Sequence, residues 1–392
     1  MFDRLPDPVP DALHAVMTRY RADTRPQRID LGVGVYRDAG GHSPVMRAVK
    51  AAEARLVSEQ SSKAYQALRG NEAFAAAMTL LVFGDGHPAV AEGRVAAIQG
   101  TGGTGSLRIA MEVARLASDG AKVHLGLPSW PNHAGLTAAT GLELVTHRYF
   151  DVRTQRVDAD AVLAAAHSAR AGDLFVLHGN CHNPTGADLS AEQRRAIIAA
   201  LAERGAVPLI DAAYYGLGDG LEADLGFLRD AAPAGRAFIS VACSKSFGLY
   251  RERTGILFAI CAGADERARV QGQMERISRT LVSMPPAHGA AVVAAILDDP
   301  ELRADWVSEL GEMRQRVLGL RVELAAQKIP LLSGIEHQRG IFRLLDIMPE
   351  QTERLGRDHA IHMPASGRIN IAGLKEGDAR RLAVALQEVA DA

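Results

Sequence analysis

Short apolar runs of strand length recur along the middle of the chain and alternate with stretches of helical apolar spacing. The runs are Val95 to Ile98, Val123 to Leu127, Leu174 to His178, Val207 to Ile210, Ala237 to Ala242 and Ile256 to Ile260. Strands that are apolar on both faces form sheets covered on both sides, and alternation with helices favours parallel pairing. The pattern predicts an α/β fold around a mainly parallel sheet, with ligands at the carboxyl ends of its strands.

Two helices have recognisable ends. Ser190 followed by Gln193 is a capping-box pattern ahead of an apolar stretch, and Gly205 supplies a stop. A second helix begins near Pro300 and keeps helical spacing for roughly 25 residues, ending before Pro330. Because this exceeds the usual length of a helix in a globular domain, we expect it to lead from a large domain to a smaller one.

The chain is therefore divided into three parts. Residues 1–40 form an N-terminal arm and part of a small domain, residues 41–300 form a large ligand-binding domain, and residues 301–392 form the long helix and the small C-terminal domain. A chain of 392 residues is long enough for this arrangement.

Charge and composition narrow the class of partner. A net charge of -2 gives no electrostatic reason to expect nucleic acid or an anionic membrane, so the expected ligand is a small molecule. The three cysteines lack paired metal spacing and are odd in number, which favours a reducing compartment over a disulfide framework. No signal-peptide core or membrane span is apparent, and we expect a cytoplasmic protein.

Candidate chemistry lies where the predicted strands end. The glycine-rich segment 100–105 (GTGGTG) precedes a helix and suits a phosphate cradle, although many such segments are only turns. Asp211 ends one strand and needs a partner if it is buried, or else caps the next element. Lys245 follows another strand, with Arg253 eight positions on; it is placed like an amine that forms a Schiff base, although a lone lysine there is usually a surface residue.

The segment 178–186 (HGNCHNPTG) also follows a strand end. His178, Cys181 and His182 fit no common zinc spacing, and no distant cysteine pair completes a site, so no metal is expected. Asn183 precedes a proline and is held extended, which aims its amide into a cleft.

Taken together, these motifs resemble those of the class I pyridoxal-phosphate (PLP) aminotransferases, in the aspartate and aromatic amino acid subgroup. The motifs are 31–36 (LGVGVY), 102–105 (GGTG), 128–133 (PSWPNH), 182–186 (HNPTG), 244–245 (SK), 285–289 (PPAHG) and 366–373 (SGRINIAG). The resemblance covers essentially the whole chain. It implies a fold type I PLP-dependent transferase with a seven-stranded, mainly parallel sheet in a large domain, a smaller α/β domain, and a homodimer with shared active sites.

The resemblance also implies roles for individual residues. Lys245 matches the lysine that binds PLP covalently and shuttles a proton, Asp211 the carboxylate that keeps the pyridine nitrogen protonated, and Tyr214 the donor to the phenolic oxygen. The phosphate cradle corresponds to Gly102, Gly103, Thr104, Ser244 and Arg253, with Tyr65 supplied by the partner subunit. Trp130 matches the indole over the ring, with His133 behind Asp211.

Substrate contacts follow in the same way. Arg368 matches the clamp on the substrate α-carboxylate, assisted by Asn183, Trp130 and the backbone of Gly34. Arg279, six residues before Pro285, matches the arginine that pairs with a distal carboxylate in the partner's active site. This implies aspartate or glutamate as amino donors and 2-oxoglutarate as the acceptor.

The chain departs from the family pattern at several places. Ala242 stands where the family has a phosphate-binding serine, residues 66–70 read QALRG, and the surroundings of Arg279 contain Leu281, Val282 and Met284. An apolar rim would admit aromatic side chains, so an aromatic aminotransferase with little aspartate activity is an alternative. A PLP-dependent lyase or racemase and a non-catalytic effector-binding domain remain further alternatives.

Overall fold

The computed structural model describes residues 2–5, 7, 12–231 and 235–390, and the chain divides into two compact units. The large unit comprises residues 44–315 and 338–340, and the small unit comprises residues 1–43, 316–337 and 341–392. The sequence analysis placed the corresponding boundaries after residues 40 and 300. N-terminal and C-terminal segments thus share one unit.

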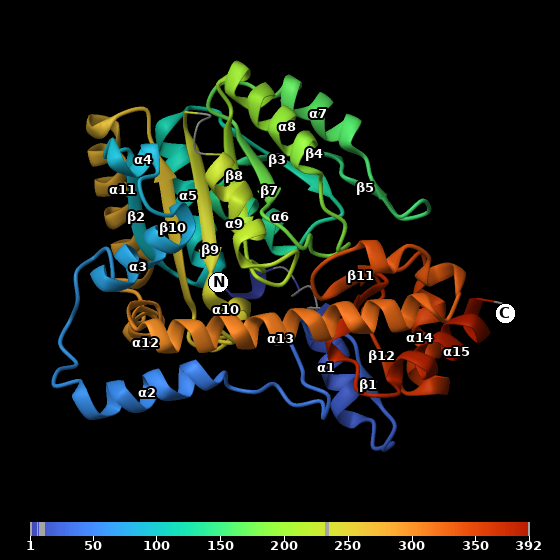
Figure 1. Ribbon diagram of the computed structural model, residues 1–392. Coiled ribbons are helices and arrows are strands. Elements are labelled where there is room, and N and C mark those ends of the chain that lie inside the picture. The colour runs from blue at the N-terminus through green and yellow to red at the C-terminus, as the bar shows by residue number, and fades with distance from the viewer. Residues whose placement is uncertain (1, 6, 8–11, 232–234, 391–392) are drawn as a thin grey trace. The chain divides into compact units, whose positions relative to one another are not determined.

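A seven-stranded sheet forms the centre of the large unit, as expected (Figure 1). In spatial order its strands are β2 (Val95–Thr101), β10 (Thr254–Ile260), β9 (Ala237–Ala242), β8 (Val207–Ala212), β7 (Leu174–His178), β3 (Lys122–Leu127) and β4 (Glu143–Arg148). Within this sheet β10 runs antiparallel to both of its neighbours, and the other pairs are parallel. The predicted α/β class with a mainly parallel sheet is confirmed.

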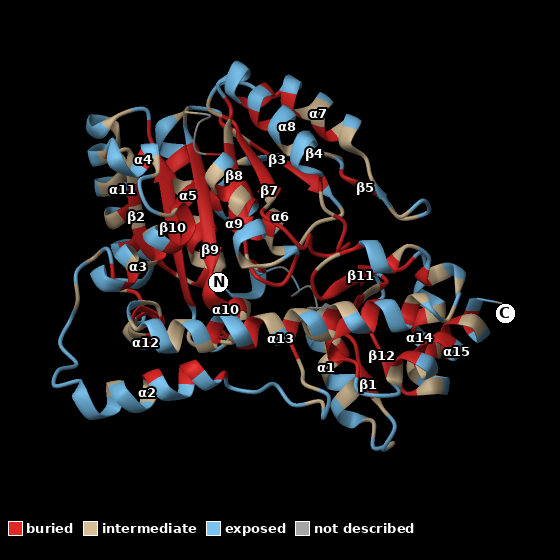
Figure 2. Ribbon diagram, in the orientation of Figure 1, coloured by how far each residue is buried: buried red, intermediate tan, exposed pale blue. Residues whose placement is uncertain are grey.

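Helices cover both faces of this sheet (Figure 1). One layer contains α5 (Gly102–Ala117), α6 (Asn132–Thr140) and α11 (Ala264–Val282), and the other contains α3 (Glu72–Phe83), α7 (Ala159–Ser168), α8 (Ala191–Arg204), α9 (Leu221–Asp230) and α12 (Ala287–Asp298). Every residue of β9 and β10 is buried as a result, and Figure 2 shows the buried centre. Helices on both sides explain why these strands are uniformly apolar.

The remaining elements of the large unit are short or lie outside the two layers. They are α2 (Arg47–Glu59), α4 (Pro88–Ala91), α10 (Cys243–Ser246) and the small hairpin of β5 (Phe150–Asp151) and β6 (Arg156–Val157).

Both predicted helices are present. Helix α8 begins after Ser190, whose hydroxyl accepts a hydrogen bond from the Gln193 amide at 3.1 Å, and ends at Gly205, which has a left-handed φ of 69°. Helix α13 (Pro300–Ala325) has 26 residues, and the division between the two units falls within it. None of the described helices is long and apolar enough to span a bilayer.

The small unit combines two short sheets with helices. Strand β1 (Ile29–Asp30) pairs in parallel with β12 (Ile361–His362), and β11 (Phe342–Leu344) pairs antiparallel with β13 (Arg368–Asn370). Around them lie α1 (Ala12–Ala22), α14 (Pro349–His359), α15 (Asp378–Ala390) and 3-10 turns at Phe2–Arg4, Pro330–Leu332, Ile335–His337 and Ile371–Gly373. Leu320 and Leu324 of α13 belong to the core of this unit.

Candidate active site

A cavity of about 240 Å³ opens at the strand ends of the large unit. It is lined by Gly103, Thr104, Trp130, His178, Asn183, Asp211, Ala213, Tyr214, Ala242, Ser244, Lys245 and Arg253. The register of the sheet brings residues of different strands to this cavity. His178 at the end of β7 lies beside Asp211 in β8, and Asp211 lies beside Ser240 near the end of β9. Nine of the lining residues are ones to which the resemblance assigned a cofactor or substrate role, and they span 150 positions of sequence from Gly103 to Arg253.

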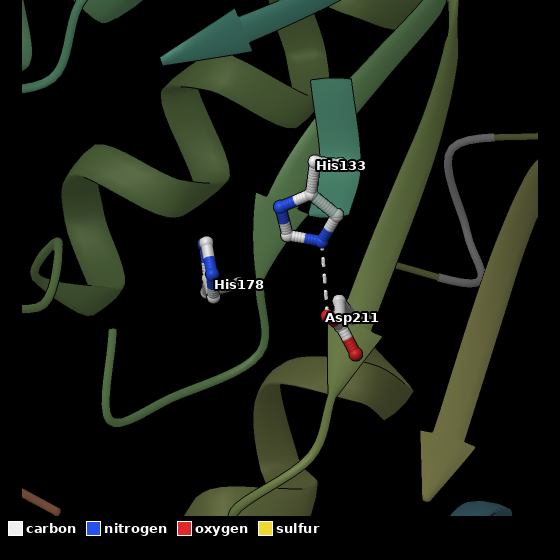
Figure 3. A group of neighbouring side chains, drawn as sticks. All are labelled: His133, His178 and Asp211. Carbon is white, nitrogen blue, oxygen red and sulfur yellow. Dashed lines mark hydrogen bonds and ion pairs between the residues drawn. The ribbon is translucent and has the colours of Figure 1, made fainter. Parts of the chain in front are cut away.

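The buried carboxylate of Asp211 is held from behind by His133 (Figure 3). Nε2 of His133 donates to Oδ2 of Asp211 at 3.0 Å, and Nδ1 of His133 accepts from the Ser129 hydroxyl at 3.0 Å. Burial alone raises the pKa of Asp211, but the hydrogen bond from His133 and the positive charge of Lys245 act in the opposite direction, and the pKa of Asp211 lies below its usual value. Asp211 is therefore ionised and suited to a cationic partner in the cavity.

His133, His178 and Asp211 also bring three possible metal-ligand atoms within 4.8 Å of one another (Figure 3). Nε2 of His133 and Oδ2 of Asp211 already form a direct hydrogen bond of 3.0 Å. A zinc ion would instead have to sit about 2.0–2.2 Å from each ligand atom. The absence of a metal at this site stays a prediction from the sequence.

A site suited to binding an anion lies at the start of α5. Gly102 has a φ of 67°, and a Cβ there would collide with the guanidinium of Arg253. Glycine thus allows Arg253 to lie against the first turn of α5, where backbone amides and the helix dipole favour negative charge. Nη1 of Arg253 is 3.4 Å from the hydroxyl of Ser244, and the side chain of Thr104 faces the same cavity. Gly102 itself supports this cradle without lining the cavity.

Lys245 lies in the one-turn helix α10, directly after β9. Its Nζ is 5.0 Å from the centre of the Tyr214 ring. The turn is fixed on two sides, since the Ser246 hydroxyl donates to the backbone oxygen of Tyr215 at 2.6 Å and the Trp306 indole donates to the backbone oxygen of Ser246 at 2.7 Å. The amine is thus presented by a short and well-anchored segment.

Two further predicted residues complete the cavity wall. Asn183 is 6% exposed, and its side-chain oxygen has no hydrogen-bond partner among the described residues, which suits a site that a ligand completes. Trp130 packs edge-on against His133 with ring centres 5.2 Å apart.

The predicted α-carboxylate clamp lies in the small unit. Nη2 of Arg368 donates to the backbone oxygen of Gly32 at 2.6 Å, and its guanidinium carbon lies 4.4 Å from the centre of the Phe342 ring. The same ring approaches Gly34 so closely that a Cβ there would lie 2.7 Å from it. Arg368 and Gly34 are therefore gathered around Phe342, and their cooperation with Asn183 stays a prediction.

Tyr65 and Arg279 do not line the cavity. Tyr65 is 92% exposed, and Arg279 is exposed in the last turn of α11. The amide of Gln66 lies 2.9 Å from the sulfur of Met284, so the segment after Tyr65 lies beside the segment after α11. Their predicted roles in a partner's site are not tested by a single chain.

The sequence analysis missed some residues that shape the site. His178 was considered only as a metal ligand, although its place at the end of an apolar run marks it as a strand-end residue. Trp306 lies within the predicted second helix, and nothing in the sequence indicated its hydrogen bond to the turn that holds Lys245.

Comparison with known proteins identifies the family. The family model described as "Aminotransferase class I and II" matches residues 26–386. A tyrosine aminotransferase of Rhizobium meliloti (strain 1021) is 46% identical, with 98% of each chain covered. An aspartate aminotransferase of Pseudomonas aeruginosa is 37% identical, with 97% of each chain covered. The crystal structure of a Burkholderia pseudomallei aromatic-amino-acid aminotransferase covalently bound to pyridoxal phosphate is 39% identical, with a TM-score of 0.96 and 99% of each chain covered. With its cavity of lysine, ionised carboxylate and anion cradle, this chain belongs to the class I and II aminotransferases.

Proposed function

We propose that this protein is a PLP-dependent transaminase that moves an amino group from an amino acid to a 2-oxo acid in two half-reactions. The observation that carries the proposal is the shared cavity of Lys245, the ionised Asp211 and the arginine-containing cradle at the start of α5. A phosphorylated pyridine aldehyde needs an amine for its aldehyde, a carboxylate for its ring nitrogen and an anion-binding site for its phosphate.

The residues present fit PLP. Its phosphate would be held by the amides at the start of α5, the hydroxyls of Thr104 and Ser244, and Arg253. Its pyridine nitrogen would be kept protonated by Asp211, its phenolic oxygen would accept from Tyr214, and Trp130 would cover the ring. When bound, PLP supplies an electron sink for the electron pair released at the substrate α carbon.

The protein's own groups supply binding and proton transfer. The Lys245 amine would hold the cofactor covalently and would move the proton at the substrate α carbon. Asp211 is kept anionic by the hydrogen bond from His133, so it would stabilise a proton on the ring nitrogen of the bound cofactor. Arg368 fixes the substrate α-carboxylate through two parallel hydrogen bonds, and Asn183 and the Gly34 backbone assist it.

We further infer a homodimer with shared active sites. The single chain leaves several large apolar or aromatic side chains in solvent. They are Tyr65 (92% exposed), Val57 (82%) and Leu281 (43%). A second copy covering this region would bring the partner subunit's Tyr65 to the phosphate and the partner subunit's Arg279 to the distal end of the substrate. Sedimentation should therefore give twice the chain mass.

Substrate choice follows from the surroundings of Arg279. Its guanidinium suits the distal carboxylate of aspartate, glutamate or 2-oxoglutarate, while Leu281, Val282 and Met284 offer an apolar surface to an aromatic ring. We propose both acidic and aromatic amino acids as donors and 2-oxoglutarate as the acceptor.

Replacing Arg279 with alanine should raise the KM for aspartate, glutamate and 2-oxoglutarate by roughly thirtyfold or more, because truncating one partner of a buried charged pair typically costs about 2 kcal/mol or more. Phenylalanine and tyrosine carry no distal charge, and their KM should change little. Steady-state kinetics on both classes of donor test this. Equal losses for acidic and aromatic donors would show that Arg279 has a structural role.

Half-reactions test the proposed function itself. The PLP-loaded protein is mixed separately with aspartate, glutamate, phenylalanine, tyrosine and tryptophan, with no 2-oxo acid added. A transaminase should change its cofactor absorption and release one oxo acid per site. Continuous release of ammonia or pyruvate would instead support the lyase alternative, and no spectral change with any donor would contradict an enzyme of this kind.

We also propose a cytoplasmic location. Its support is chemical, because Cys181, Cys243 and Cys261 are all buried and form no disulfide with one another, a usage typical of reducing compartments.

A further inference from the structure

The turn that leads from β7 to Asn183 is held by a carboxylate from outside the cavity. Asp188 accepts the amide of Cys181 on Oδ2 at 2.8 Å and the amide of His182 on Oδ1 at 2.9 Å. Cys181 has a φ of 52°, a left-handed conformation that is costly for a residue with a side chain. Both oxygens of Asp188 are thus used to maintain an unfavourable turn immediately before Asn183.

Arg194 holds the other end of the same turn. Its Nη1 donates to the backbone oxygen of Gly179 at 3.1 Å, and its guanidinium carbon lies 4.6 Å from the centre of the Phe227 ring. Arg194 belongs to the first turn of α8, which the capping box of Ser190 and Gln193 fixes. A rigid helix end therefore anchors the start of the turn.

Charge links the two residues. Burial raises the pKa of Asp188 above its usual value, and the amides of His182 and Cys181 and the positive charge of Arg194 offset part of this rise. Arg194 and Asp188 also line one small cavity of about 10 Å³ together with His178 and His182. The positive charge thus favours the ionised carboxylate, which is the better acceptor for two amides.

We propose that Arg194 and Asp188, neither of which lines the cofactor cavity, are positioning residues that set the turn 179–182 and thereby fix Asn183 for the substrate α-carboxylate. The role of Asn183 in this statement rests on the proposed function. The positioning itself is a property of the chain and can be measured without turnover.

The first measurement is hydrogen exchange in the protein with and without PLP. Arg194→Met keeps an unbranched apolar stem over Phe227 but removes the charge and the donors. Exchange at the amides of Cys181 and His182 should then become on the order of tenfold faster, because a hydrogen bond to a charged group is weakened. The matched control is Arg195→Met, the exposed neighbour on α8. Equal exchange in both variants and wild type would overturn the proposal.

The second measurement is a double-mutant cycle in the PLP-loaded enzyme. Arg194→Met should raise the KM of every amino acid donor on the order of tenfold, with a smaller change in kcat, because the amide of Asn183 is displaced. In an Asn183→Ala background the same change should have little further effect. Arg194→Lys, which keeps the charge, should restore part of the loss. Full additivity with Asn183→Ala would overturn the proposal.

Asp188→Asn provides a second route if Arg194→Met lowers the yield of folded protein. Its single amide oxygen serves only one of the two backbone amides, so exchange and KM should change in the same directions. Wild-type exchange in Asp188→Asn would contradict the proposal. If amide exchange is faster in the variants but the wild-type protein shows no half-reaction with any donor, the positioning role is supported and the proposed transaminase function is contradicted.

Discussion

Replacing Lys245 with alanine should lower turnover at least about a hundredfold, the usual contribution of one general acid–base group. The variant should still bind PLP, because Asp211, Ser244 and Arg253 remain in the cavity. Borohydride treatment followed by mass spectrometry should find the cofactor fixed to the wild-type chain but not to the variant.

A suitable control is Lys122→Ala. Lys122 begins β3 and pairs with Glu143 at 2.7 Å, so it lies on the same sheet without lining the cavity. Its loss should leave turnover unchanged. Retention of more than about one hundredth of turnover in Lys245→Ala would show that another group carries the proton.

Replacing Asp211 with alanine should lower turnover per bound cofactor by roughly a hundredfold or more, the effect of removing one preorganised electrostatic group. The loss should appear mainly in the step that removes the proton from the substrate. In that step the cofactor ring receives electron density, and Asp211 is proposed to stabilise the protonated ring nitrogen that accepts it. Single-turnover absorption measurements with α-deuterated donor separate this step from cofactor binding. Weak cofactor retention with normal activity in the remaining loaded sites would contradict the role.

The chain offers a matched control for this experiment. Asp173 is buried and accepts from His124 at 3.0 Å, as Asp211 does from His133, but it does not line the cavity. Asp173→Asn should therefore lower the melting temperature while leaving turnover per folded site unchanged.

Much of the large unit was predictable because its central strands are apolar on both faces. All six runs correspond to strands of the sheet, but β4 was missed. As an edge strand of sequence ELVTHR it has no buried residue, so it lacks the continuous apolar signal of β9. The strands of the small unit have two or three residues each, too few to show any period.

The site was predictable to the extent that its residues form contiguous motifs at strand ends. Arg194 carries no such signal, because a charged residue in the first turn of a helix usually faces solvent. Its contact with Gly179 depends on how α8 packs against the sheet, where it contacts β8, and the local sequence does not encode this packing. Tyr65 and Arg279 were identified by family resemblance alone, and the single chain leaves both on its surface.

The antiparallel direction of β10 places Lys245 and Arg253 in one short connection between neighbouring strands. Because β10 is antiparallel to β9, the chain leaves the sheet at Ala242 and re-enters it at Thr254 on the same edge. One connection of eleven residues, 243–253, therefore delivers both the amine of Lys245 and the guanidinium of Arg253. A parallel return would require a crossover of a dozen or more residues and would begin at the far edge. The residues proposed to bind the cofactor covalently and to bind its phosphate thus lie in one short connection, so an insertion or deletion there would displace both at once.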